Sequence, residues 1–298
     1  MTASLKKPRR PEPPPPAGGC RPREFPYSDK TFRKFAAIIH QRSGIHLSGA
    51  KKEMVYGRLA RRVRAVGLKS IDDYCALIGR EDEEEEFNRA LNAITTNHTR
   101  FFREAHHFDH LTEHVLMPAA HNRGSAGQNG LRIWSAGCSR GQEPYTIALT
   151  VLATLPDAPQ RDIKILATDL DTEVLGTARQ ATYPAETATE ITPAYRSTFL
   201  KYSERSKTTI RFTRPPRSLI VFRTLNLTNP WPMRQKFDAI FCRNVLIYFN
   251  NADTEKLIRR LTDKLLPGGF LYLGHSESVL NQNIALDLVA RTTYQAKS

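Results

Sequence analysis

The stretch that most constrains the fold is residues 131–145, which reads LRIWSAGCSRGQEPY. It begins as a short apolar run and ends in a loop bracketed by Gly137 and Gly141. From Glu143 the pattern becomes helical, and Pro144 suits a first helical turn. Strand, glycine loop and helix are typical of the opening unit of a nucleotide-binding α/β sheet. The loop lacks the third glycine of the dinucleotide fingerprint, so the motif alone also fits a βα turn without a ligand.

Further apolar runs predict strands downstream, at residues 163–171, 219–227 and 237–249. An amphipathic helix at residues 251–266 and a Pro-Gly-Gly turn lead into a fifth strand, FLYLGHSE. The last residues, ALDLVARTTYQAK, are typical of a hairpin at the edge of a sheet. This alternation predicts an α/β fold with a doubly wound, mainly parallel sheet.

Polar residues follow several of the predicted strands, and parallel strands end at the same edge of a sheet. These residues are Glu143, Asp169, Asn226 and Asn244. Any one of them alone would fit a cap or a turn, but their succession favours a ligand site at that edge. Asp169 in particular can accept hydrogen bonds from both hydroxyls of a ribose.

The segment between the second predicted helix and the third strand, residues 192–222, is too long for an ordinary connection. Within it, FLKYS and TIRFT predict two short strands joined by a polar turn. We expect a small antiparallel β insertion that docks a partner or covers the site.

The N-terminal third has a different character. Residues 1–27 are rich in proline and charge and predict a disordered tail, whereas residues 28–96 predict short helices. The helix predicted at residues 51–66 carries a basic stripe beside its apolar face and a single acid, Glu53. The stripe consists of Lys51, Arg58, Arg61 and Arg62. Because it is not paired within its helix, it favours a binding face for an acidic partner over a merely solvated face.

Composition limits the classes of function. The chain has 298 residues, 40% of them hydrophobic, and a formal net charge of +14, which attracts anionic partners. It has no run of 18 apolar residues and no secretory signal, so a cytoplasmic protein without a membrane span is expected. The cysteines lack the paired spacing of a zinc site. His106, His110 and His114 share a helical face without supporting ligands, so no metal is expected.

Several motifs then carry a resemblance to a known family. TTNHTRFFREAHHF, IWSAGCSRGQEPY, ATDLDTEVL, FDAIFCRNVLIYF and LLPGGFLYLGHSE, in this order, resemble the CheR chemoreceptor methyltransferases. The basic helix KKEMVYGRLARRVRAVGL is similar to that family's N-terminal domain. The resemblance implies an all-α N-terminal domain followed by a Rossmann-like domain for S-adenosylmethionine (SAM) at residues 97–298.

The implied activity is methyl transfer from SAM to glutamate side chains of methyl-accepting chemotaxis proteins, which leaves S-adenosylhomocysteine. The resemblance implies cofactor contacts at Asn97, Thr99, Arg103, Glu143, Asp169, Asn226, Leu227, Arg243 and Asn244. It places Tyr248 near the transferred methyl group as the catalytic residue. The basic stripe would hold the cytoplasmic helical domain of a receptor. A monomer that binds no nucleic acid is expected.

The chain departs from the family pattern in the glycine loop and in the β insertion. Arg140 and Gln142 stand where relatives commonly have threonine and glutamate. The turn SERSK has no glycine, whereas some members grip a receptor's C-terminal peptide with a glycine-containing loop. Two alternatives stay open: an RNA methyltransferase and a non-catalytic sensor that binds SAM or another nucleotide. Against the former, CRNV lacks an Asn-Pro-Pro-Tyr loop, and few aromatics accompany the basic stripe.

Overall fold

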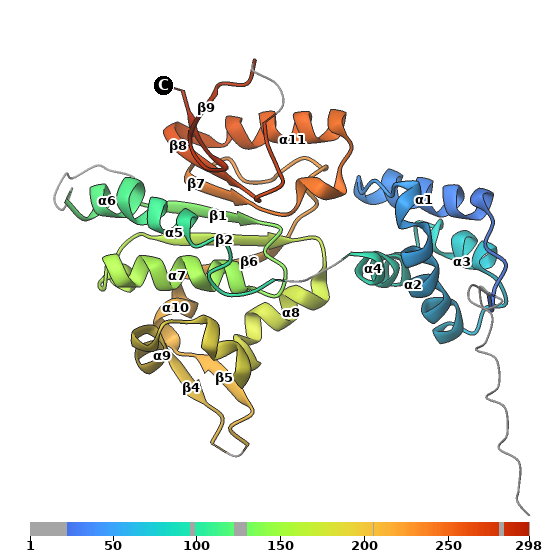
Figure 1. Ribbon diagram of the computed structural model, residues 1–298, viewed down its shortest axis with the longest axis horizontal. Coiled ribbons are helices and arrows are strands. Elements are labelled where there is room, and N and C mark those ends of the chain that lie inside the picture. Colours follow the sequence, from blue (N-terminus) through green and yellow to red (C-terminus); the bar gives the residue numbers. More distant parts are fainter. Residues whose placement is uncertain (1–22, 96–98, 122–129, 205, 280–282, 298) are drawn as a thin grey trace, which may run out of the picture.

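The computed structural model describes residues 23–95, 99–121, 130–204, 206–279 and 283–297. Most of the tail predicted at residues 1–27 therefore lies outside the described residues. The described chain forms a helical part, α1 to α4, beside a larger part built on a mixed sheet (Figure 1). No helix among these residues has the length and apolar character needed to cross a bilayer.

The helical part has the short helices that the sequence predicts. Ser28 caps the first helix by accepting the amide of Thr31, and Gly44 ends it in the left-handed conformation. The core of this part includes Phe35, Ile39 and Leu59, which are fully buried. The elements are α1 (Asp29–Ser43), η1 (Gly49–Lys51), α2 (Lys52–Ala65), α3 (Ile71–Ile78) and α4 (Glu84–Ile94).

The main sheet has seven strands in the order β6-β2-β1-β7-β8-β10-β9. The pairs from β6 to β8 are parallel, and β10 is antiparallel to both of its neighbours, as the predicted hairpin at the edge requires. The doubly wound sheet is thereby confirmed. Its strands are β1 (Arg132–Ala136), β2 (Lys164–Asp169), β6 (Ile220–Thr224), β7 (Phe237–Cys242), β8 (Leu265–Leu273), β9 (Leu286–Ala290) and β10 (Thr293–Ala296).

Alternate residues of the central strands supply different cores, because successive side chains of a strand point to opposite faces. Ile133 and Phe241 belong to one core, with side chains from α5 and α7, whereas Trp134 and Ile240 belong to another with α11. The helices around the sheet are α5 (His106–Leu111), the π-helical η2 (Thr112–Leu116), α6 (Met117–His121), α7 (Gln142–Thr154), η3 (Ala158–Gln160), α8 (Thr172–Gln180) and α11 (Asn251–Asp263).

The β insertion is present, with one strand more than the sequence predicts. The strands β4 (Leu200–Tyr202) and β5 (Thr209–Phe212) correspond to FLKYS and TIRFT, and β3 (Thr182–Pro184) pairs with the other side of β5. The strand β3 follows directly on α8, and its three residues are too few to show a period of two. The remaining elements here are η4 (Ala185–Glu190), α9 (Pro193–Phe199) and α10 (Arg214–Leu219).

Several predicted boundaries are wrong. The strand predicted at residues 237–249 ends at Cys242, and the helix predicted at residues 251–266 ends at Asp263. The turn expected at Pro267–Gly269 lies inside β8, which begins at Leu265. The pairing of β8 with β7 shifts its register at this point. The Gly269 backbone lies close to strand β7, since an added Cβ would be 3.1 Å from the carbonyl oxygen of Asp238. A sequence pattern cannot distinguish such a close strand approach from a turn.

The helical part contacts the sheet at the carboxyl ends of its parallel strands. The His46 amide donates to the carbonyl of Tyr248 at 2.7 Å, and Asn226 Nδ2 donates to the carbonyl of Arg42 at 3.4 Å. Gly44 lies against Thr228 so closely that an added Cβ would be 2.2 Å from Cγ2 of that threonine. The two parts therefore meet at the edge where ligands bind in such folds.

Candidate active site

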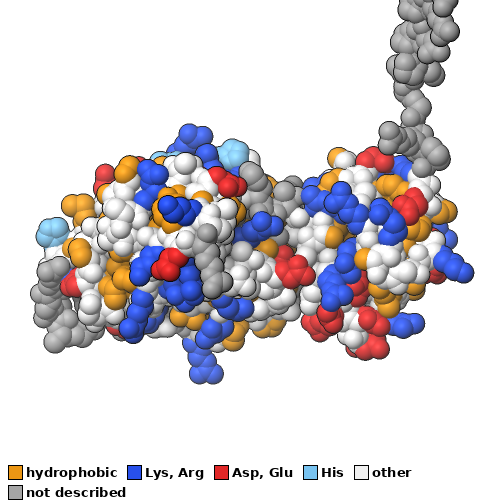
Figure 2. Space-filling view, turned by 90° about the horizontal axis from the view of Figure 1, so that it is seen from below, with side chains coloured by type: hydrophobic (Ala, Val, Ile, Leu, Met, Phe, Trp, Pro, Cys, Tyr) orange, Lys and Arg blue, Asp and Glu red, His pale blue; other side chains and the backbone are white. Residues whose placement is uncertain are grey.

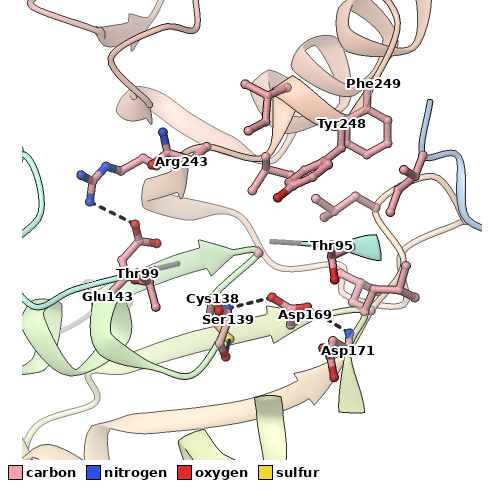
Figure 3. Close-up of a pocket in the computed structure, with 18 of the residues that line it drawn as sticks. Thr95, Thr99, Cys138, Ser139, Glu143, Asp169, Asp171, Arg243, Tyr248 and Phe249 are labelled. Carbon is pink, nitrogen blue, oxygen red and sulfur yellow. Dashed lines mark hydrogen bonds and ion pairs between the residues drawn. The ribbon is translucent and has the colours of Figure 1, made fainter. Parts of the chain in front are cut away.

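A pocket of about 340 Å³ lies at this edge of the sheet, and both parts of the chain line it. Figure 3 shows Tyr248 on one side of the pocket and Asp169 on the other, with Arg243 and Glu143 further along. The pocket contains nearly all of the predicted cofactor residues: Thr99, Arg103, Glu143, Asp169, Asn226, Leu227, Arg243 and Asn244. The predicted catalytic residue, Tyr248, lines it too, whereas Asn97 lies outside the described residues.

The helical part supplies pocket residues that the sequence did not predict. Ser43 and Ile45 come from the end of α1, and Leu91, Asn92 and Thr95 come from the end of α4. No local pattern marks them, because their place in the pocket depends on how the helical part contacts the sheet.

The glycine loop after β1 is shaped by packing as well as by ligand access. Gly137 has a φ of +80°, and a Cβ there would lie 2.4 Å from Cγ2 of Val245, in the segment after β7. Gly141 has a φ of +95°, and a Cβ there would lie 2.8 Å from the Tyr183 hydroxyl. Both positions need glycine for conformation and for close contact. The first of them places the loop directly against the segment that carries Tyr248.

Asp169 ends β2 and is held by backbone amides on both oxygens. Ser139 donates to Oδ2 at 2.7 Å, and Asp171 donates to Oδ1 at 2.9 Å. Burial raises the pKa of Asp169 to about 6, although these amide hydrogen bonds oppose the rise. A free lone pair on each oxygen can still accept a hydroxyl proton, so the ionised carboxylate can hold a diol.

This pKa predicts a pH dependence of nucleoside binding. Only the ionised form of Asp169 can accept hydrogen bonds from ribose hydroxyls, so the affinity should be nearly complete at pH 7 and above and should fall as the carboxylate is protonated near and below pH 6. From pH 7 to pH 5, the dissociation constant for S-adenosylhomocysteine should rise about tenfold, by proton linkage. Calorimetric titrations check this, with the fold verified at each pH. In Asp169→Asn the step should vanish, and an equal step in that variant would contradict the assignment.

Arg243 lies at the centre of a buried ionic cluster. Its side chain is 2% exposed and lies 3.1 Å from Oε2 of Glu143 and 3.3 Å from Oε2 of Glu104. Ser135 donates to the other oxygen of Glu143 at 2.7 Å. Burial raises the pKa of Glu143, and Arg243 opposes that rise. Glu104 is also partly buried, but Arg243 and His275 hold its pKa below its ordinary value. The cluster fixes Glu143 at the start of α7.

The sequence analysis missed Glu104. It is 39 residues from Glu143 and 139 from Arg243 in the chain, and a single acid within REAHHF carries no sign of an ion pair. Its φ of +58° is unusual for a residue other than glycine. The resemblance to family motifs covers this segment but does not by itself reveal the contact.

The basic stripe of α2 is more engaged than expected. Arg62 forms bidentate hydrogen bonds to Glu86 of α4, at 2.7–3.0 Å, and Tyr74 donates to the same carboxylate at 2.7 Å. Arg58 donates to the carbonyls of Ala93 and Thr95 at the end of α4, each at 3.0 Å. Arg62 has no acidic partner within its own helix, as the sequence indicates, but Glu86 of α4 supplies one.

Arg61 and Lys51, the other members of the stripe, lie in different surroundings from Arg58 and Arg62. Arg61 is exposed, and the Lys51 ammonium lies 5.4 Å from the centre of the Tyr248 ring. Lys51 thus places a positive charge beside the pocket.

A second basic surface covers the β insertion, α10 and part of β6. Figure 2 looks onto this side of the molecule and shows lysine and arginine side chains gathered there. Its exposed members are Lys201, Lys207, Arg211, Arg214, Arg217 and Arg223. Much of the positive charge of the chain thus lies away from α2. Across the described ranges, no three histidine, cysteine or acidic side chains are grouped as metal ligands.

Residues 97–295 match a family model described as CheR methyltransferase, SAM binding domain, and residues 30–95 match CheR methyltransferase, all-alpha domain. A probable chemotaxis protein methyltransferase of Rhizobium etli is 40% identical over 260 residues, covering 87% of this chain and 96% of the relative. The chemotaxis protein methyltransferase of Escherichia coli is 38% identical over 269 residues, covering 90% and 91%. Chemotaxis protein methyltransferase 2 of Pseudomonas aeruginosa is 37% identical over 275 residues, covering 91% and 94%.

Proposed function

Because the chain belongs to the CheR family of SAM-dependent methyltransferases, we propose that it methylates glutamate side chains of chemoreceptors. The products are glutamyl methyl esters and S-adenosylhomocysteine. The observation that carries the proposal is the pocket at the carboxyl edge of the sheet, where the motif residues converge on Tyr248 and Asp169. The cytoplasmic helical domain of a receptor would present the glutamates, so the enzyme would act in the cytoplasm.

The donor set of the pocket fits SAM. Asp169 offers carboxylate oxygens to the ribose hydroxyls, and Leu170, Leu225 and Leu227 offer an apolar wall for a base. Glu143 would accept hydrogen bonds from the amino group of the methionine end, because Arg243 and Ser135 hold that carboxylate in a fixed orientation. When bound, the cofactor supplies an activated methyl group.

The proposed acceptor explains why the pocket needs no nucleophile or base from the protein. A glutamate side chain, with a usual pKa of about 4.3, is already ionised at neutral pH. The protein has to align its oxygen with the methyl group, and orientation alone can be worth roughly 7–11 kcal/mol of a barrier. Tyr248 can orient the carboxylate with its hydroxyl, which points into the pocket in Figure 3. Lys51, beside the Tyr248 ring, can offset part of the cost of bringing an anion out of water.

The exposed part of the basic stripe would contact the acidic receptor. We expect Arg61→Glu to raise the receptor KM about 3- to 10-fold, because an exposed attraction is replaced by a repulsion. Cofactor affinity should not change, since Arg61 lies outside the pocket. Steady-state kinetics at low ionic strength checks this. Arg33→Glu, which reverses an exposed charge on α1, is the matched control, and equal KM values for the two variants would contradict a receptor contact at Arg61.

The test of the function is transfer of radiolabelled methyl from SAM to purified acceptors. An acidic, helical coiled-coil fragment of a receptor is compared with total RNA and with the same fragment carrying glutamine at its glutamates. Base-labile label on the first acceptor alone supports the proposal. Label on RNA would favour the RNA methyltransferase, and tight cofactor binding without transfer to any acceptor would favour a sensor. Either outcome would overturn the proposal.

A further inference from the structure

The segment that carries Tyr248 leaves the sheet at once after β7 and makes no regular strand contacts. It runs from Asn244 through η5 (Leu246–Tyr248) to the start of α11. Asn244 adopts a φ of +58°, in the left-handed region. Backbone amides in such a segment need partners if they are buried. A residue far along the chain supplies a partner for these amides.

That partner is Glu277, in the turn after β8. Its carboxylate accepts backbone amides on both oxygens: Oε2 accepts those of Asn244, at 2.8 Å, and Gly274, at 2.7 Å, while Oε1 accepts that of Leu246, at 2.8 Å. The residue is 6% exposed. No lysine, arginine or histidine within the described residues forms an ion pair with it. A buried carboxylate that accepts hydrogen bonds from three backbone amides serves to organise that backbone.

The surrounding residues leave room for this contact and for little else. A Cβ on Gly274 would lie 2.6 Å from Nδ2 of Asn244 and 2.7 Å from Oε2 of Glu277. Val245, in the same segment, lies against Gly137, where an added Cβ would be 2.4 Å from its Cγ2. At its far end the segment is held by the His46 amide, which donates to the carbonyl of Tyr248. The position of the Tyr248 ring is therefore set from both ends of the turn.

We propose that Glu277 is a positioning residue, which acts through the Asn244–Leu246 backbone to aim Tyr248 at the acceptor carboxylate. It does not line the pocket, so it touches neither cofactor nor acceptor. The burial that raises the pKa of Glu277 is opposed by the same amide hydrogen bonds, which favour its charged form. The inference rests on the proposed function for its catalytic part, whereas its structural part can be measured without methyl transfer.

The structural part is tested by amide hydrogen exchange in Glu277→Gln. The glutamine side chain keeps the volume but turns an amide NH₂ toward backbone N–H groups. Exchange of the peptide spanning residues 243–249 should become at least about tenfold faster, as expected when a local hydrogen-bond network is lost. Asp238→Asn is the matched control, because Asp238 also accepts a backbone amide, that of Arg132 at 2.8 Å, but at the start of β1. Unchanged exchange in Glu277→Gln would overturn the inference.

The catalytic part is tested by a double-mutant cycle with Tyr248→Phe. Glu277→Gln alone should lower kcat at least about tenfold, with a smaller effect on the receptor KM, and should add little in the Tyr248→Phe background. A residue that only stabilised the fold would give additive losses in kcat, and this result would overturn the inference. If the wild-type chain transfers no methyl group to a receptor, the proposed function fails, and the exchange experiment still decides the role of Glu277 in the turn.

Discussion

Replacing Arg243 with methionine is expected to lower the free energy of unfolding by about 3–5 kcal/mol, the range found when one partner of a buried ion pair is removed. The guanidinium is nearly inaccessible and lies between the carboxylates of Glu104 and Glu143. Without it, the two carboxylates, whose side chains are only 12% and 13% exposed, would lose the cation that lies between them. Methionine keeps most of the side-chain length, so the lost stability would come from the missing charge rather than from a cavity. Denaturant unfolding monitored by circular dichroism measures the change.

Arg259→Met provides the comparison. Arg259 pairs with Glu255 on the same helix, but both side chains are more than 40% exposed, and removal of such a pair costs about 0–1 kcal/mol. Adding Glu104→Gln to Arg243→Met should recover part of the loss, because it removes one of the stranded charges. Equal stabilities for the two arginine variants would show that the buried cluster is not held by its charge.

Tyr248→Phe is expected to lower kcat about 100-fold, within the range for loss of one well-placed hydrogen-bond donor in a catalytic site. The substitution keeps the ring, the 3₁₀ turn and the contact with the Lys51 ammonium, and it removes only the hydroxyl. The dissociation constant for S-adenosylhomocysteine should therefore change by less than about threefold, since the hydroxyl is assigned to the acceptor. Radiolabel transfer and calorimetric titration measure the two quantities.

Tyr202→Phe, at an exposed position of β4, removes a hydroxyl that does not line the pocket and should leave both quantities unchanged. Equal losses of turnover and cofactor affinity in Tyr248→Phe would contradict the assigned role. They would instead indicate that the tyrosine serves to bind the cofactor.

The sequence predicts the part of this molecule that local patterns encode. The short apolar run at Ile133 and Trp134 predicts a strand, and the glycines after it predict a tight loop. Because parallel strands end at one edge, Asp169 and Asn226 could be placed in a common site before any coordinates. In the structure, both residues line one pocket.

Contacts between distant segments were beyond the reach of the sequence. A helical wheel places Arg58 and Arg62 on one basic stripe, but it cannot show that α4 lies along that stripe, with Glu86 at Arg62 and the carbonyl of Ala93 at Arg58. In the same way, Glu277 follows a strand as an ordinary turn residue, and only the tertiary fold brings it to the amide of Asn244. Contacts of this kind, between an acid and an arginine or amide from another part of the chain, produce no periodic pattern in the sequence.

The wall that the N-terminal helices contribute to the proposed cofactor pocket has a consequence for how such proteins can diversify. Ile45 and Leu91 face the same cavity as Asp169, although they belong to the region that carries the basic stripe. Exchange of that region between relatives with different receptors would alter nucleoside affinity along with target preference. In a hybrid made for a new receptor, the pocket residues from the N-terminal helices would not match those from the sheet unless these apolar residues were exchanged together.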